Sequence, residues 1–131
     1  MRLTTVLFTD AIEPSIPFWV QGLGFSITAE VPQGDKLGFV ILTRDNLELM
    51  LQTYASLAED IPALAVPPTG SSCSLFFEVS DFDQTAASLA AFPVIVPERV
   101  TFYGMREIGF LAPSGHTVVI AVKSPQTPPA N

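Results

Sequence analysis

The chain has 131 residues, of which 48% are hydrophobic and 15% are charged, so length and composition predict one globular domain rather than a disordered chain. Six basic residues stand against 13 acidic ones, and the formal net charge of −7 argues against nucleic acid and anionic membrane surfaces as partners. The single cysteine, Cys73, excludes an internal disulfide and favours a cytoplasmic setting, and no apolar run reaches the roughly 20 residues that span a bilayer.

The first half of the chain is predicted to form a strand, a helix and further strands. Leu3–Phe8 alternates weakly between apolar and polar residues, as a strand does. Pro14–Gln21 is predicted as a helix because its prolines lie where a first turn tolerates them and glycines follow its end. Gly38–Leu42 and Asn46–Gln52 are predicted strands joined by a turn.

The second half repeats this order. Ser74–Val79 and Thr117–Val122 alternate like strands. Asp81 and Gln84 have the spacing of a capping box, which predicts a helix from there to Ala91. The segment from Gly109 precedes a turn and the last strand.

Two short matches align the halves at a period of about 70 residues. Phe8-Thr9-Asp10 corresponds to Val79-Ser80-Asp81, and Gly38-Phe39 corresponds to Gly109-Phe110. Counting ten residues on from each of those glycines makes Glu48 equivalent to Val119. The predicted organisation is one domain, with module one over about 1–53, a linker over 54–72, module two over about 73–122 and a tail over 123–131.

Three motifs in this order carry a family resemblance that covers nearly the whole chain up to Val122. They are Pro17-Phe18-Trp19 leading to Leu23-Gly24-Phe25, then Tyr103-Gly104-Met105-Arg106-Glu107, then Pro113-Ser114-Gly115-His116. The chain resembles the glyoxalase / bleomycin-resistance / extradiol-dioxygenase superfamily, also called vicinal oxygen chelate proteins. The resemblance implies an α+β fold, in which two tandem βαβββ modules form a curved eight-stranded mixed sheet with helices on its convex face. It also implies a cavity on the concave face and pairing as a homodimer, which would cover the open sheet edges.

The resemblance further implies where metal ligands would stand. The positions that match the ligands of the family's metal enzymes are Thr4, Glu48, Ser74 and Val119, with Thr5 as the other candidate for the first. Hydroxyl groups are poor ligands for transition metals, and valine offers no donor atom. We therefore expect no metal and no other cofactor, as in the metal-free branch that includes drug-binding resistance proteins.

If Glu48 faces the cavity, strand alternation places neighbouring side chains with it and puts an apolar face opposite. The predicted ligand-binding residues are Thr4, Val6, Phe8, Glu48, Met50, Ser74, Phe76, Val119, Arg106 and Tyr103. Glu48 is also the one candidate catalytic base, and the alternative is a carboxylate that is half-solvated or paired with a nearby arginine.

Structural roles compete with ligand binding at other positions. Arg106 and Glu107 are neighbours, so only one of them can face the cavity. The structural alternative for both is a hydrogen bond or an ion pair within the protein. Tyr103 precedes Gly104 at a hairpin, where a turn role is the alternative. His116 is expected to be a solvated turn residue, and Cys73 an inert small hydrophobe.

The leading functional hypothesis is a metal-free protein that sequesters a drug-like or metabolite ligand in a concave cavity, as antibiotic-resistance proteins of this kind do. The alternative is a lyase, isomerase or dioxygenase of the same fold, either metal-dependent or using Glu48 as a base. A third hypothesis is an interaction module without a ligand.

Overall fold

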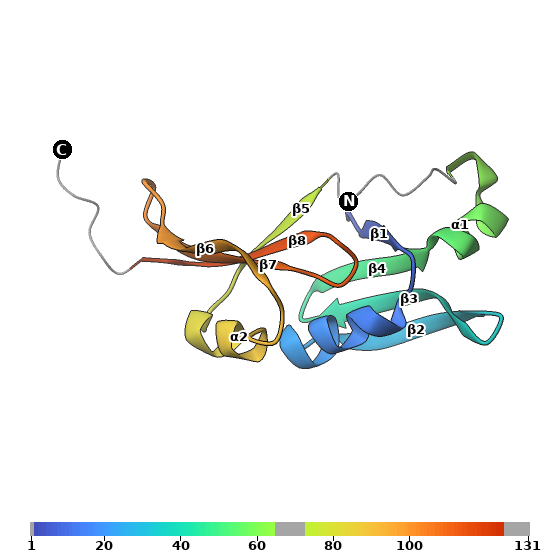
Figure 1. Ribbon diagram of the computed structural model, residues 1–131, viewed down its shortest axis with the longest axis horizontal. Coiled ribbons are helices and arrows are strands. Elements are labelled where there is room, and N and C mark those ends of the chain that lie inside the picture. The colour runs from blue at the N-terminus through green and yellow to red at the C-terminus, as the bar shows by residue number, and fades with distance from the viewer. Residues whose placement is uncertain (1, 65–72, 125–131) are drawn as a thin grey trace. The chain divides into compact units, whose positions relative to one another are not determined.

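The computed structural model describes residues 2–64 and 73–124, and the chain divides into two compact units, residues 1–70 and 71–131. Each unit contains one four-stranded sheet (Figure 1). The first unit, module one, has strands β1 (Thr5–Thr9), β2 (Ser26–Gln33), β3 (Lys36–Arg44) and β4 (Leu47–Thr53). The second unit, module two, has strands β5 (Ser74–Glu78), β6 (Val94–Val100), β7 (Met105–Leu111) and β8 (Thr117–Lys123).

Both sheets have the same topology. The strand order is β1-β4-β3-β2 in module one and β5-β8-β7-β6 in module two. In each sheet the first strand runs parallel to the last, and the remaining pairs are antiparallel. The predicted α+β class and the tandem strand–helix–three-strand modules are confirmed.

The expected single eight-stranded sheet is corrected to two four-stranded sheets. Each module pairs its own first strand with its own last strand, so each sheet is complete within one module. Among the described residues, strand pairing stays inside each module.

One face of each sheet forms the module's core, as strand alternation predicts. In module one, Leu49 and Leu51 lie opposite Leu42 and Val40 on the neighbouring strand, and all four are at most 5% exposed. In module two, Val118 and Ile120 are fully buried on the corresponding face. Burying each such side chain contributes about 1.5–3 kcal/mol before conformational entropy is subtracted.

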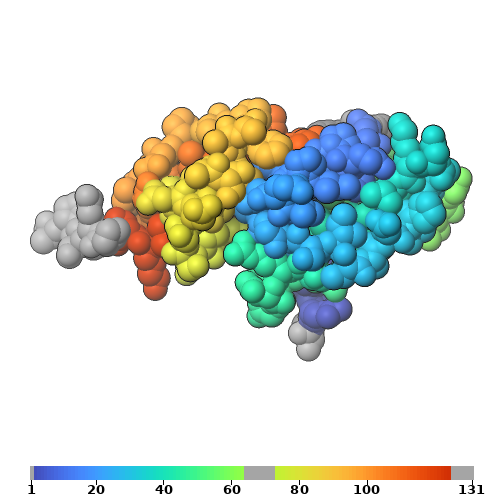
Figure 2. All heavy atoms as spheres, turned by 90° about the horizontal axis from the view of Figure 1, so that it is seen from below, coloured from blue at the N-terminus to red at the C-terminus, as the bar shows by residue number. Residues whose placement is uncertain are grey.

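The predicted helix over Pro14–Gln21 is two short helical segments instead. A 3-10 turn, η1 (Glu13–Ser15), is followed by a π-helical turn, η2 (Pro17–Gly22). Pro17 has no N–H and its ring crowds the preceding turn, so a continuous α-helix is disfavoured there. The wider turn is closed by the Leu23 N–H, which donates to the Phe18 carbonyl at 3.0 Å. Figure 2 shows this segment and strand β2 side by side on one face of module one.

The second predicted helix is confirmed as α2 (Phe82–Ser88), although it ends before Ala91. The Asp81 carboxylate accepts a hydrogen bond of 3.0 Å from the Gln84 N–H, which is the predicted cap. The segment predicted as a linker contains two more helices, α1 (Tyr54–Asp60) and η3 (Pro62–Leu64). No helix in the described part of the chain is long and apolar enough to cross a membrane.

The two Gly-Phe pairs of the sequence repeat are not structurally equivalent. Gly109 pairs directly with Val119, whereas the residue that pairs with Glu48 is Thr43. Phe110 lies on the buried face of its sheet, but Phe39 lies opposite Gln52 on the other face. Counting from these glycines therefore does not establish that Glu48 and Val119 are equivalent, although both lie on the face away from their module's core.

Candidate functional site

The face of the first sheet opposite Leu49 and Leu51 is called here the open face of module one. A row of three apolar side chains crosses it, because Met50 on β4 pairs with Val6 on β1 and with Ile41 on β3. Val6 is 38% exposed, and Met50 and Ile41 are half-buried. The next row contains Phe8, Gln52 and Phe39. An apolar floor of this kind suits contact with the body of a small molecule.

Glu48 lies on the same face, at the start of β4, and is held by two partners. Its Oε1 accepts a hydrogen bond of 2.9 Å from the Thr4 hydroxyl and lies 3.3 Å from Arg2 Nη2. The Glu48 side chain is 20% exposed, while that of Arg2 is 78% exposed. The structure thus shows a largely shielded carboxylate that is also paired with an arginine, which combines parts of the two interpretations of Glu48.

Arg2 was not among the residues predicted from the sequence. Residues 2, 4, 6 and 8 share one side of an extended chain, so alternation counted backwards from Val6 and Thr4 would have placed Arg2 here. Arg2 was not predicted because the strand pattern is weak at the N-terminus and β1 itself begins only at Thr5.

Module two has its own open face, opposite Val118 and Ile120. Phe76 pairs with Val119 there, and Phe76 is 54% exposed. Ser74 pairs with Thr117, two residues before Val119. These three predicted residues, Ser74, Phe76 and Val119, therefore share one face of one sheet.

Glu107 rather than Arg106 lies on this open face. Glu107 pairs with Ala121, and its Oε1 binds Arg99 Nε at 2.7 Å and Arg99 Nη2 at 2.6 Å. The Glu107 side chain is 5% exposed and that of Arg99 is 63% exposed. Sequence reasoning left open which of the neighbours 106 and 107 faces this side, and it did not identify Arg99.

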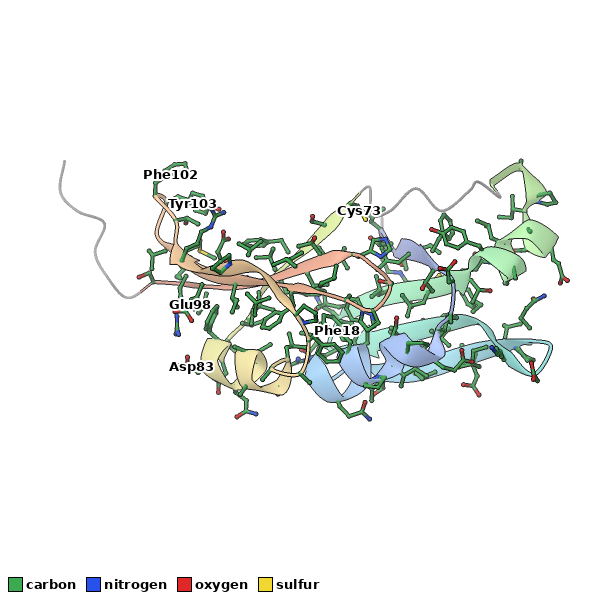
Figure 3. All side chains as sticks on the ribbon, viewed as in Figure 1. Phe18, Cys73, Asp83, Glu98, Phe102 and Tyr103 are labelled. Atoms are coloured by element: carbon green, nitrogen blue, oxygen red, sulfur yellow. The ribbon has the colours of Figure 1, made fainter. Side chains whose placement is uncertain are left out.

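Arg106 lies on the face covered by α2, so within module two it lies on the opposite face from Ser74, Phe76 and Val119. Its guanidinium stands 4.1 Å from the centre of the Phe82 ring and binds Asp83 at 2.9 Å and Glu98 at 3.2 Å. Figure 3 shows Asp83 and Glu98 on this side of the sheet. Hydrogen bonds to Glu98 and then Asp83 raise the pKa of Arg106. The arrangement joins α2 to β6, as the structural interpretation of Arg106 expected.

Tyr103 lies at the tip of the hairpin between β6 and β7, beside Phe102 (Figure 3). The two ring centres are 4.9 Å apart in an edge-to-face arrangement. Gly104 has φ of 83°, and its N–H donates to the Thr101 carbonyl at 3.0 Å, which closes the turn. The predicted turn is present, and Tyr103 is 58% exposed at its tip.

His116 and Cys73 differ from expectation. His116 is 8% exposed rather than solvated, and its Nδ1 lies 2.8 Å from the Ser114 hydroxyl. Burial lowers the pKa of His116. Cys73 is exposed at the start of β5 instead of packing as a small hydrophobe. The imidazole is thus buried although it lies at the hairpin turn into β8, which the turn residues alone did not reveal.

A shallow hollow of about 160 Å³ lies at the opposite end of β4 from Glu48. It is lined by Asp10, Ala11, Glu13, Gln33, Lys36, Leu37, Thr53 and Ala55. Glu13 Oε2 accepts a hydrogen bond of 2.7 Å from the Leu37 N–H, and that bond lowers the pKa of Glu13. None of the predicted ligand-binding residues lines this hollow.

The residues predicted from the sequence to stand at the family's metal-ligand positions do not fit a transition metal. Glu48 contributes one carboxylate that is already bonded to Thr4 and Arg2, and Val119 has no donor atom. Within residues 2–64 and 73–124, no three His, Cys, Asp or Glu side chains gather closely enough to hold a metal ion. No step that depends on a bound metal follows from this donor set.

Comparison with solved structures supports the fold. A glyoxalase/bleomycin resistance protein/dioxygenase from Nocardioides is 21% identical over 100% of this chain and 89% of its own, with a TM-score of 0.72. A glyoxalase-related enzyme from Fulvimarina pelagi is 19% identical over 94% of this chain and 88% of its own, with a TM-score of 0.75. Lactoylglutathione lyase from Agrobacterium tumefaciens is 16% identical over 93% of this chain and 92% of its own, with a TM-score of 0.72.

Sequence comparison assigns the family. No curated protein matches the chain. The family model described as Glyoxalase/Bleomycin resistance protein/Dioxygenase superfamily matches residues 3–120, which include all eight strands up to the middle of β8. With the two βαβββ modules and the structural neighbours in agreement, the chain belongs to the glyoxalase/bleomycin resistance protein/dioxygenase superfamily.

Proposed function

We propose that this chain is a small-molecule-binding member of the superfamily that acts without a transition metal and binds its ligand on the open face of module one. The observation that supports this most is the composition of that face. It joins an apolar row, Val6, Met50 and Ile41, to one polar cluster, Thr4, Glu48 and Arg2. Pockets for small molecules combine apolar walls with a few placed polar groups in this way.

The same composition favours sequestration over catalysis. General acid–base chemistry needs a positioned group that is available to accept or donate the proton. The only acidic or basic side chains described on this face are Glu48 and Arg2, and they are paired with each other. A ligand held here would be shielded rather than transformed, as the hypothesis of a resistance-type binding protein requires.

The competing function is an enzyme of the same fold. The neighbour named lactoylglutathione lyase carries an activity in its name, but at 16% identity the similarity concerns the fold alone. A lyase, isomerase or dioxygenase would need a metal that this donor set does not fit, or Glu48 released from Arg2 to act as a base.

Metal loading and a lyase assay test the proposal together. Purified protein would be incubated separately with zinc, nickel, manganese and iron(II), desalted, and measured both for bound metal and for formation of S-lactoylglutathione. We expect far less than one metal ion per chain and no product above the uncatalysed background, because two of the four expected ligands are weakly binding hydroxyl groups and a third, Val119, has no donor atom. About one bound metal per chain, or product formation by any loaded sample, would overturn the proposal.

We propose in addition a homodimer in a reducing, cytoplasmic setting. The outer strands of the two sheets, β1 and β2 in module one and β5 and β6 in module two, leave sheet edges, some of which a second copy would cover. The single cysteine, Cys73, is exposed, and an exposed free thiol persists best in a reducing compartment.

A further inference from the structure

We infer that Arg2 occupies, in the free protein, the place of a ligand's cationic group at Glu48, so that the open face of module one selects organic cations with an apolar body. Arg2 is then an internal competitor that the ligand displaces. The inference rests on the proposed function and adds to it the chemical class of the ligand and a role for Arg2.

The first support is the unequal exposure of the two partners. The Glu48 side chain is 20% exposed and therefore gains from a permanent cationic partner. The Arg2 side chain is 78% exposed and returns to water at little cost when it leaves. A ligand ammonium group therefore replaces Arg2 without leaving a buried charge unpaired.

The second support is the looseness of the contact. A single Arg2 nitrogen, Nη2, reaches a single carboxylate oxygen at 3.3 Å, while Thr4 holds that oxygen at 2.9 Å. In module two, by contrast, Arg99 binds Glu107 through two nitrogens at 2.6 and 2.7 Å, and Glu107 is only 5% exposed. The Arg2 pair is thus built to open more readily than the Arg99 pair.

The third support is the apolar row beside the carboxylate. Met50 is two residues along β4 from Glu48, so the two side chains project from the same face roughly 7 Å apart. Val6 and Ile41 flank Met50 on the neighbouring strands. A ligand with an ammonium group and an aromatic or branched body a short link away fits this spacing, and the net charge of −7 attracts it from solution.

Three matched probes test the inference by amide chemical-shift titration of the full-length, isotope-labelled protein. They are 2-phenylethylamine, which is a cation at pH 7, the neutral 2-phenylethanol and the anionic 3-phenylpropanoate. The variants are Arg2→Gln, Glu48→Gln and Lys36→Gln, which lies at the exposed start of β3 and serves as the control for Arg2→Gln because it changes the net charge equally. The spectra also report whether each variant is folded.

We expect the amine to bind the wild type more tightly than the alcohol, with shifts at Val6 and Met50. Arg2→Gln should tighten amine binding by about 1.5–5-fold over Lys36→Gln, the range of a partly exposed ion pair. Glu48→Gln should make the amine and the alcohol bind equally.

Several results would overturn the inference. Equal affinity of the wild type for the amine and the alcohol would show that the face does not select cations. Tightest binding of 3-phenylpropanoate would show that Arg2 binds anions instead. Weaker or unchanged amine binding by Arg2→Gln would end the role of Arg2 as a competitor. If the alcohol still binds the face in these cases, the proposed function survives, whereas no shift with any probe would defeat both.

Discussion

Among single side chains, His116 couples the stability of the protein to pH. It is 8% exposed, and burial lowers its pKa from the ordinary value of 6.5. Below about pH 6.5 the unfolded chain takes up a proton at this residue while the folded protein resists it. The contribution of His116 is therefore fully present above pH 6.5, and the free energy of unfolding falls as the pH drops below that value.

We predict that urea denaturation shows a lower free energy of unfolding at pH 5.5 than at pH 7.5, and that His116→Gln shows a shallower dependence. Glu13 does not contribute to the difference in stability between pH 5.5 and pH 7.5. Its lowered pKa, caused chiefly by the hydrogen bond from the Leu37 N–H, lies below the ordinary 4.5, so Glu13 stays ionised across this range. Equal pH dependence of the wild type and the variant would show that His116 is not the responsible group.

Alternation along the strands predicted part of the candidate site at the residue level. It placed Glu48 and Met50 on the same face as Val6, and it identified the opposite apolar face, where Leu49 and Leu51 are buried. It could not choose between Arg106 and Glu107, because neighbouring residues alternate and the face depends on the register with β8. Thr4 was predicted on the face of Glu48 and does bond to it, but the arginine partner was missed, because Arg2 precedes the first strand and is 46 residues away along the chain.

At the level of elements, the strand–helix–three-strand order of each module was predicted, but the type of the first helix and the two helices α1 and η3 were not. Alternation and turn residues predicted the strands that became β4, β5 and β8 to within one residue at either end. The π-helical turn η2 depends on Pro17 and on the hydrogen bond from Leu23 to Phe18, which no periodic pattern reveals. The two Gly-Phe pairs looked equivalent in the sequence but lie differently in their sheets, because the pairing register depends on hairpin length and not on local sequence similarity.

The glycine at position 109 lets β6 approach β7 closely. A Cβ added to Gly109 would lie 2.7 Å from both Cβ and Cγ2 of Val96 and 3.5 Å from Cγ2 of Val119. We predict that Gly109→Ala lowers the free energy of unfolding by about 1–3 kcal/mol, the usual cost of overpacking, in urea denaturation.

A double-mutant cycle gives the control for this strand contact. Val96→Gly removes the two atoms that the new methyl group would meet, so Gly109→Ala should cost clearly less in that background. Additive effects of the two substitutions would mean that the close approach of β6 and β7 does not cause the loss.

At the scale of the whole molecule, the proposed homodimer is open to direct measurement. Among the described residues each sheet has two outer strands, β1 and β2 in one module and β5 and β6 in the other, and unpaired strand edges favour association unless they are blocked. We predict that sedimentation velocity at micromolar concentration gives a mass of about twice that of the 14.1 kDa chain. A monomer mass under these conditions would contradict the prediction.

The central claim is that this chain carries an organic ligand and no transition metal, and native mass spectrometry of the untagged protein purified from its own cells tests it most directly. We predict a species whose excess mass over the bare chain is an organic molecule that is lost on denaturation. The probe experiments above would then show whether that molecule, once identified, shares the cationic character expected at Glu48. A species whose excess mass is one transition metal ion per chain, with no organic ligand, would contradict the account.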